Sequence, residues 1–140
     1  MLVLNPRLVT FNQQTWQNVT AVLLNRTASK ENVEWSDMGP HVAMADVPEQ
    51  RITIKVIQTL DADDLDAAKP ADAGTLTLHT SPAASDARRK RISAQVVITR
   101  VEHEISLKRG AMRTVTMVAI STDGLTDPIL VEDDPEGGGA

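Results

Sequence analysis

The stretch that decides the fold is Arg88–Leu130, RRKRISAQVVITRVEHEISLKRGAMRTVTMVAISTDGLTDPIL. Apolar residues in its first part recur at every second position: Ile92, Ala94, Val96 and Ile98. This alternation, with β-branched residues and Gly-containing turns, is typical of half-buried β-strands. The stretch therefore predicts two strands joined by a short turn, followed by a second turn at Asp123-Gly124 and a short closing strand.

The apolar positions of the first strand change phase after Ile98, because Val101, Ile105 and Leu107 continue on odd numbers. One extra residue in a strand turns all later side chains to the opposite face. The phase change therefore predicts a β-bulge between Ile98 and Val101, or a strand that passes from one packing environment to another.

Gly110 marks the turn between these two strands, because glycine adopts positive φ without steric cost. A three-residue loop at Arg109–Ala111 predicts that Ile105 lies opposite Val115. The returning strand Val115–Ile120 is apolar on both faces. This pattern predicts that both of its faces are covered, one by the core of the chain and the other by something else.

The segment of residues 96–129, VVITRVEHEISLKRGAMRTVTMVAISTDGLTDPI, resembles the C-terminal half of the tail tube proteins of long-tailed bacteriophages. Those chains end in a long strand, a short turn, a second long strand and an acidic-Gly turn leading to Asp-Pro. The resemblance covers the last third and extends, as an order of elements, from Gln50 onward. It implies a mainly β antiparallel sandwich or barrel with one short helix, whose hexameric rings stack into a channel for DNA ejection.

The resemblance also implies partners and a location. The chain is expected to bind copies of itself in the virion tail after assembly in the host cytoplasm, with sheath, tape-measure, baseplate and terminator proteins as further partners. DNA would pass through without specific binding, and no membrane is involved. The alternatives are the inner tube of a contractile secretion system, a tail terminator or neck ring protein, and a small carbohydrate- or peptide-binding β-sandwich.

Composition limits the other classes of function. The 140 residues suit a single domain. The net charge of -5 argues against tight DNA binding, and the absence of cysteine excludes disulfides and thiolate chemistry. The N-terminal MLVLNPRLVTF is too short for a signal peptide and is interrupted by Pro6, and no apolar run reaches the length of a membrane span.

The remaining chain predicts further strands. Short extended pieces are expected at Met1–Leu4 and Arg7–Phe11, and longer strands at Gln50–Leu60 and Gly74–Thr80. Trp16–Asn25 is expected to be a strand, although a helix is the competing interpretation. The side chains expected to face the core are Trp16, Val19, Ala21, Leu23, Ile52, Ile54, Val56, Leu76 and Leu78.

The segment Arg26–Gln50 lacks a strong core pattern and is broken by Gly39-Pro40. It predicts a long projecting loop or a protruding hairpin. In tail tube proteins, the loop at the corresponding position reaches the neighbouring ring. The basic run Arg88–Arg91 is either a solvated strand entrance or a partner for acidic groups of a neighbouring subunit. Together these segments give the candidate contact residues Arg26, Lys30, Glu31, Trp35, Asp37, His41, Arg88, Arg89, Lys90, Arg91, Asp63 and Asp64.

The acidic sequence DADDLD, residues 61–66, predicts the start of a short helix, capped by Asp61 or Asp63, that Pro70 ends. A calcium loop would need a glycine and a closing bidentate Glu, and both are missing. The chain ends in VEDDPEGGGA, which starts at Val131. Its last part, residues 132–140, forms an acidic and Gly-rich tail that is expected to be mobile in a free monomer.

No catalytic constellation is evident in the sequence. The three histidines lie on separate predicted strands, no serine sits in a G-x-S-x-G context, and no phosphate-binding Gly-rich loop occurs. The sequence therefore predicts a non-enzymatic structural protein without cofactor or metal. If Gln50–Leu60 and Arg91–Leu107 line the channel, Glu102 and Glu104 are the expected lumen-facing residues.

Overall fold

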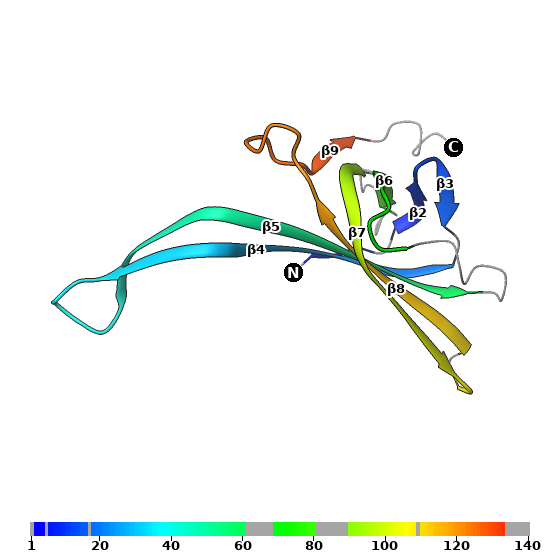
Figure 1. Ribbon diagram of the computed structural model, residues 1–140, viewed down its shortest axis with the longest axis horizontal. Coiled ribbons are helices and arrows are strands. Elements are labelled where there is room, and N and C mark those ends of the chain that lie inside the picture. The colour runs from blue at the N-terminus through cyan, green and yellow to red at the C-terminus, as the bar shows by residue number, and fades with distance from the viewer. Residues whose placement is uncertain are drawn as a thin grey trace.

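The computed structural model describes residues 2–4, 6–16, 18–60, 69–80, 90–108 and 110–133. These residues form strands that all belong to one sheet (Figure 1). The strands are β1 (Leu2–Leu4), β2 (Pro6–Phe11), β3 (Gln14–Trp16), β4 (Val19–Trp35), β5 (Val42–Leu60), β6 (Ala73–Thr80), β7 (Lys90–Ser106), β8 (Gly110–Ala119) and β9 (Leu130–Asp133).

The sheet is antiparallel, with the strand order β1-β4-β5-β8-β7-β6-β2-β3 and with β9 beside β7. Buried residues from both ends of this order, such as Val22 of β4 and Val9 of β2, belong to the same core cluster. The mainly β prediction is therefore confirmed. The predicted barrel is wrong for the described residues, because the terminal strands β1 and β3 do not pair with each other and have only three residues each.

The inward faces predicted for three strands are confirmed. Side chains at alternate positions are buried on β5, β6 and β7: Ile52, Ile54, Val56, Leu76, Leu78, Ile92, Ala94, Val96 and Ile98. Their neighbours Lys55, Thr75 and Gln95 are exposed. Successive side chains of a strand point to opposite faces, so the sequence alternation determines which of them enter the core.

The inward face predicted for β4 is wrong. Val22 and Leu24 are buried, whereas Ala21 and Leu23 are only half-buried on the opposite face. Trp16 is buried, but it belongs to β3 and is separated from β4 by Asn18, whose φ is 57°. A register shift between Val19 and Ala21 changes the phase of the strand, so alternation counted from Trp16 selects the wrong side.

The β7–β8 hairpin confirms the bulge and corrects the turn. The register shifts between Ile98 and Arg100, within the predicted interval. Ser106 pairs with Gly110, whose φ is 70°, so the turn lies two residues earlier than predicted. Ile105 consequently lies opposite Ala111, whereas a partner at Val115 was predicted. The Ser106 hydroxyl accepts a hydrogen bond from the Lys108 amide at 3.1 Å, which favours the earlier turn.

Among the described residues, the core contains one charged side chain, which the sequence did not reveal. Arg113 on β8 is 1% exposed, and its guanidinium donates a hydrogen bond to Gln58 on β5. The guanidinium also lies 5.2 Å from the centre of the Trp16 ring. A buried guanidinium is tolerated only with such partners. The predicted helix after Asp61 lies outside the described residues, as does the tail beyond residue 133.

Candidate functional site

A long hairpin formed by the outer parts of β4 and β5 projects from the rest of the molecule (Figure 1). Pairing continues from Arg26 opposite Ile52 to Trp35 opposite Val42, and residues 26–51 are all exposed. We call this segment the arm. Of the two forms expected for Arg26–Gln50, the structure has the hairpin. Isolated two-stranded ribbons are marginally stable in water, so an arm of this length is suited to a partner surface.

One face of the outer arm is apolar. Cross-strand partners point to the same side of a sheet, which groups Trp35 with Val42 and Val33 with Ala45. Trp35 is 59% exposed, and Met38, in the turn, is 93% exposed. Large apolar side chains clustered on an exposed surface indicate an interaction site. Sequence reasoning selected Trp35 but missed its apolar neighbours, because β4 and β5 carry them at distant positions.

The outer arm is also acidic. Between residues 31 and 49 the chain has no Lys or Arg, and its acidic residues there are Glu31, Glu34, Asp37, Asp46 and Glu49. The basic residues of the arm, Arg26, Lys30 and Arg51, lie nearer its base. All of these positions, and His41, are exposed. The tip, with Glu34, Asp37 and Asp46, is therefore negative, whereas nearer the base Lys30 lies opposite Glu49, and Arg26 and Arg51 add positive charge.

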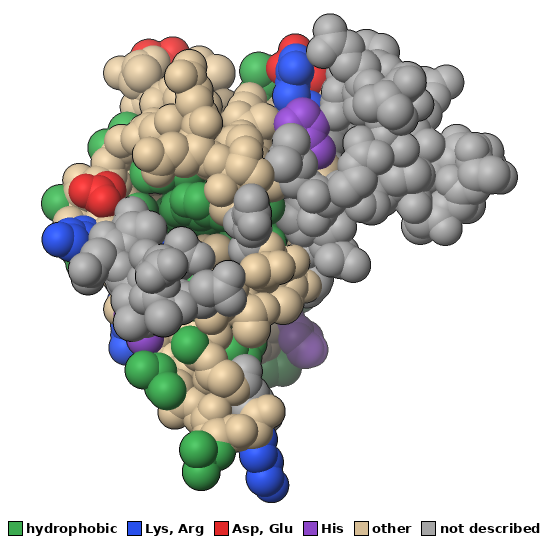
Figure 2. Space-filling model, turned by 90° about the vertical axis from the view of Figure 1, so that its right-hand side faces the viewer, with side chains coloured by type: hydrophobic (Ala, Val, Ile, Leu, Met, Phe, Trp, Pro, Cys, Tyr) green, Lys and Arg blue, Asp and Glu red, His purple; other side chains and the backbone are tan. Residues whose placement is uncertain are grey.

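The β7–β8 hairpin projects in another direction and presents apolar and basic side chains at its end (Figures 1 and 2). Ile105 and Leu107 are exposed there, next to Lys108. Glu102 and Glu104, the predicted lumen residues, are exposed, and Arg100 lies 3.2 Å from Glu102. The Arg100 guanidinium offsets the Glu102 charge, so this face is less acidic than the glutamates alone suggest.

Only one side chain of the basic run can be placed. The Arg91 guanidinium lies 3.2 Å from the Glu132 carboxylate, and both residues belong to this chain. Within the chain Arg91 is paired with β9, because β7 and β9 lie side by side, and a contact of the basic run with acidic groups of a neighbouring subunit stays a prediction. Arg88, Arg89, Asp63 and Asp64 lie outside the described residues, and of Lys90 only the backbone is described.

The loop after β8 is organised by Asp123. One oxygen of its carboxylate accepts hydrogen bonds from the amides of Leu125 at 2.8 Å and Thr126 at 2.9 Å, and the other accepts one from the Thr126 hydroxyl. These donors stabilise the ionised form, so they hold the pKa of Asp123 well below its ordinary value. The Asp-Gly signal predicted the turn, with Gly124 at a φ of 74°.

This loop is joined to the base of the arm. The Arg26 guanidinium lies 3.1 Å from the Asp127 carboxylate, and Asp127 also accepts a hydrogen bond from the Ile129 amide at 2.9 Å. Sequence reasoning selected Arg26 for an intersubunit contact and missed this partner within the chain. No local sequence signal connects two residues so far apart.

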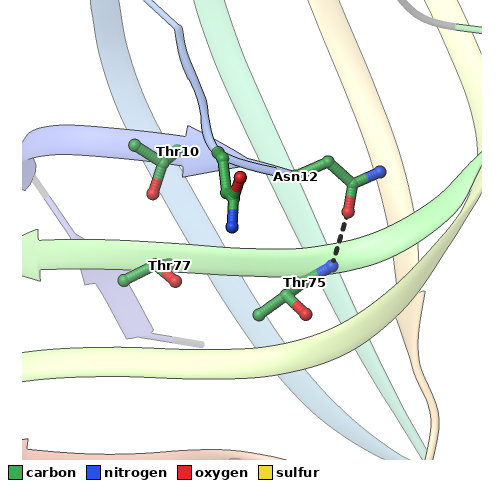
Figure 3. A pocket seen from close by; sticks show the side chains of 5 residues that line it. Thr10, Asn12, Thr75 and Thr77 are labelled. Atoms are coloured by element: carbon green, nitrogen blue, oxygen red, sulfur yellow. Dashed lines mark hydrogen bonds between the residues drawn. The ribbon is translucent and has the colours of Figure 1, made fainter.

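A shallow hollow of about 380 Å³ lies over β2 and β6 and is lined by Thr10, Asn12, Gln13, Thr75 and Thr77 (Figure 3). These side chains are polar and uncharged, and none offers the aromatic face on which sugars stack. The histidines lie apart, on the arm, on β6 and on β7. Within the described part of the chain, no cluster of three or more His, Asp or Glu residues is arranged to hold a metal.

Comparison with known proteins gives limited similarity. No protein-family model matches the chain, and no curated protein matches it. A solved structure of the tail of an empty GTA particle, obtained by helical refinement with C6 symmetry, aligns with a TM-score of 0.48 and 7% sequence identity. The alignment covers 86% of this chain and 87% of that chain. A likeness at this level does not assign a function.

Among the described residues, no helix is both long enough and apolar enough to cross a membrane.

Proposed function

We propose that this chain is a structural, non-enzymatic subunit of a tail tube, which assembles with copies of itself into hexameric rings that stack into a channel. The observation that carries the proposal is the arm, an exposed two-stranded ribbon with Trp35 and Met38 at its outer end. The resemblance of residues 96–129 to tail tube proteins supports the same conclusion from the sequence.

The arm suits an assembly subunit for an energetic reason. Over residues 26–51 it has no buried side chain, so within this chain little apolar burial offsets the cost of ordering its backbone. A second copy would supply the missing burial. The neighbouring strands β1 and β8 pair with β4 and β5 only in the body of the molecule, so they do not cover the outer edges of the arm. Uncovered strand edges favour pairing with other chains.

The body of the molecule also has an apolar surface that copies could cover. Val118 of β8 is half-buried on the side opposite the core, and Ile120 beyond the strand is exposed, so the second face of Val115–Ile120 is not fully covered within the described chain. Leu23 and Ile57, on the same outer side of the sheet, are also half-buried. Covering this face with an identical subunit would complete the two-sided burial that the sequence predicts.

In this proposal the rings join through heterologous contacts, and the arm reaches the adjacent ring. The tube wall would carry Glu102, Glu104 and Arg100, on the part of this face that lies near the β7–β8 turn, while a neighbouring copy covers the apolar part that Leu23, Ile57 and Val118 form. A hydrated wall of mixed charge lets DNA pass without being retained. Sheath, tape-measure, baseplate and terminator proteins are the further partners proposed, and the virion tail is the proposed location.

The test is negative-stain electron microscopy of the purified full chain over a series of concentrations. Rings or stacked tubes with an open central channel are expected as concentration rises. The matched variant Trp35→Ala should retain rings and lose stacking, whereas Thr15→Ala, an exposed change on β3, should alter neither. A uniformly small monomer at all concentrations, also in the presence of preformed tail initiation complexes, would overturn the proposal.

A further inference from the structure

A groove of about 590 Å³ lies between the base of the arm and the loop that follows β8. The arm contributes Arg26, Pro48 and Gln50, Ile52 lies beside them on β5, and the other wall is formed by residues 119–121 and 124–128. Ile52 is buried, whereas Ile120 and Leu125 expose apolar surface at this groove. No described side chain of the same chain fills it, so the groove is open to a partner.

The loop wall of the groove is preorganised. Asp123 fixes Leu125 and Thr126 through their amides, and Asp127 is held by Arg26. Leu125 is nevertheless 92% exposed, so a rigid loop holds a large apolar side chain in solvent. A surface fixed before binding loses little conformational entropy on association, which favours it as a docking site.

We propose that this groove receives the tip of the arm of a second copy of the chain, with Trp35 as the side chain that enters it. The inference rests on the proposed self-assembly and identifies the surface to which the arm binds. Trp35 is the largest side chain of the tip and is 59% exposed. Buried tryptophans are frequent energetic anchors of interfaces, and the exposed apolar groups of Ile120 and Leu125 complement an indole ring.

Charge complementarity favours this occupant. The tip carries Glu34 and Asp37 beside Trp35, within the segment that has no Lys or Arg. The receiving end carries Lys30 and Arg51 on the arm base, whereas the charge of Arg26 in the groove is offset by its ion pair with Asp127. Opposite charges on the two ends steer the tip of one copy toward the base of another and disfavour contacts between two tips.

The arm cannot place its tip in its own groove. Arg26 and Trp35 are separated along one extended strand, which at about 3.3 Å per residue spans roughly 30 Å. The contact therefore joins different surfaces of two copies, and a contact of this kind repeats. Each arm base would receive the tip of another copy, which gives a stacked array.

The absence of native cysteine allows a direct test by disulfide trapping. Met38→Cys places a thiol at the tip, and Leu125→Cys places one at the rim of the groove; both native side chains are more than nine-tenths exposed. The two full-length variants are mixed under mild oxidation, and mixed disulfides are counted on a denaturing gel. Met38→Cys mixed with Thr15→Cys is the matched control, because Thr15 is exposed on β3, outside the groove.

We expect the tip and groove variants to cross-link at least tenfold more than the control pair, and Trp35→Ala in the tip variant to abolish that difference. Electron microscopy of the same samples reports assembly separately. Stacked particles without the tip-to-groove disulfide would overturn this contact and leave the tube proposal standing. Preferential cross-linking to Thr15→Cys would also overturn it, whereas the predicted disulfide without tubes would support the contact and overturn the tube.

Discussion

Asn12 shows how one side chain replaces a piece of regular strand pairing. Its φ is 52°, and at the end of β2 its backbone amide donates to the Thr75 carbonyl at 3.0 Å. Its side-chain oxygen accepts from the Thr75 amide at 3.1 Å (Figure 3), and its side-chain nitrogen donates to the Ala73 carbonyl at 3.1 Å. The side chain thereby extends the ladder between β2 and β6 beyond the last paired residues.

This arrangement requires glycine at position 74. A Cβ atom there would lie 1.8 Å from the Asn12 side-chain oxygen, so we expect Gly74→Ala to displace Asn12 and to lower the free energy of unfolding by about 1–3 kcal/mol. Chemical denaturation measures the loss. Gly39→Ala, where the added Cβ meets nothing within 4 Å, is the control and should change stability by no more than about 0.5 kcal/mol.

A double-mutant cycle separates the clash from a general intolerance of alanine in β6. Asn12→Gly removes the obstructing side chain and permits positive φ, so adding Gly74→Ala to it should cost less than in the native chain. An equal cost in both backgrounds would show that the Asn12 contact is not the cause.

Asp123 provides a prediction of pH dependence. Its ordinary pKa is 3.8, and hydrogen bonds from Thr126 and Leu125 lower the pKa in the folded chain. A lowered folded pKa means that the contribution to stability is fully present above about pH 4 and is lost as the pH falls through the folded value. Carboxyl-carbon NMR should therefore show Asp123 still ionised well below pH 3.8. Titration of Asp123 at its ordinary value would refute the hydrogen-bonded loop as the cause.

At the level of elements, β5 has two different environments along its length. The inner part, from Thr53 to Leu60, lies between β4 and β8 and pairs with both strands over most of its length. Its even-numbered side chains are buried. The outer part, from Val42 to Arg51, is paired with β4 and is exposed. Local unfolding of the outer part therefore exposes little additional apolar surface to water. We expect the outer part to unfold independently of the body.

Hydrogen exchange tests this difference within a single strand. In dilute monomer, we expect the amides of Met44 and Asp46 to exchange much faster than those of Ile54 and Val56. In assembled particles, the arm amides should become protected while those of the body change little. Slow exchange of the arm in the monomer would contradict an arm that depends on a partner for its stability.

For the whole molecule, the proposed contact between copies depends on the separation of charge between the tip and the base of the arm. Electrostatic attraction at exposed surfaces is screened over about 10 Å at 0.1 M salt and about 3 Å at 1 M. We therefore expect sodium chloride at 1 M to raise the concentration required for stacking several-fold, as measured by light scattering. If apolar burial alone drove stacking, salt would leave it unchanged or strengthen it, as excluded salts do.

The sequence by itself determined the local features of this protein. Alternation fixed the inward sides of β5, β6 and β7, the change of phase located the bulge after Ile98, and Gly110 and Asp123-Gly124 identified turns. These features depend on residues close together in the chain, through backbone conformation and the two-residue period of a strand. The absence of a core pattern in Arg26–Gln50 similarly marked the arm.

Only the tertiary structure decided how distant segments meet. Arg26 contacts Asp127 across 101 positions, and Gln58 is joined to Arg113 across 55. The register of β7 with β8, the inward side of β4 and the open ends of the sheet likewise depend on which backbone groups find partners. Strand propensity does not select a partner or a register, because pairing energies come from contacts between residues far apart in the sequence.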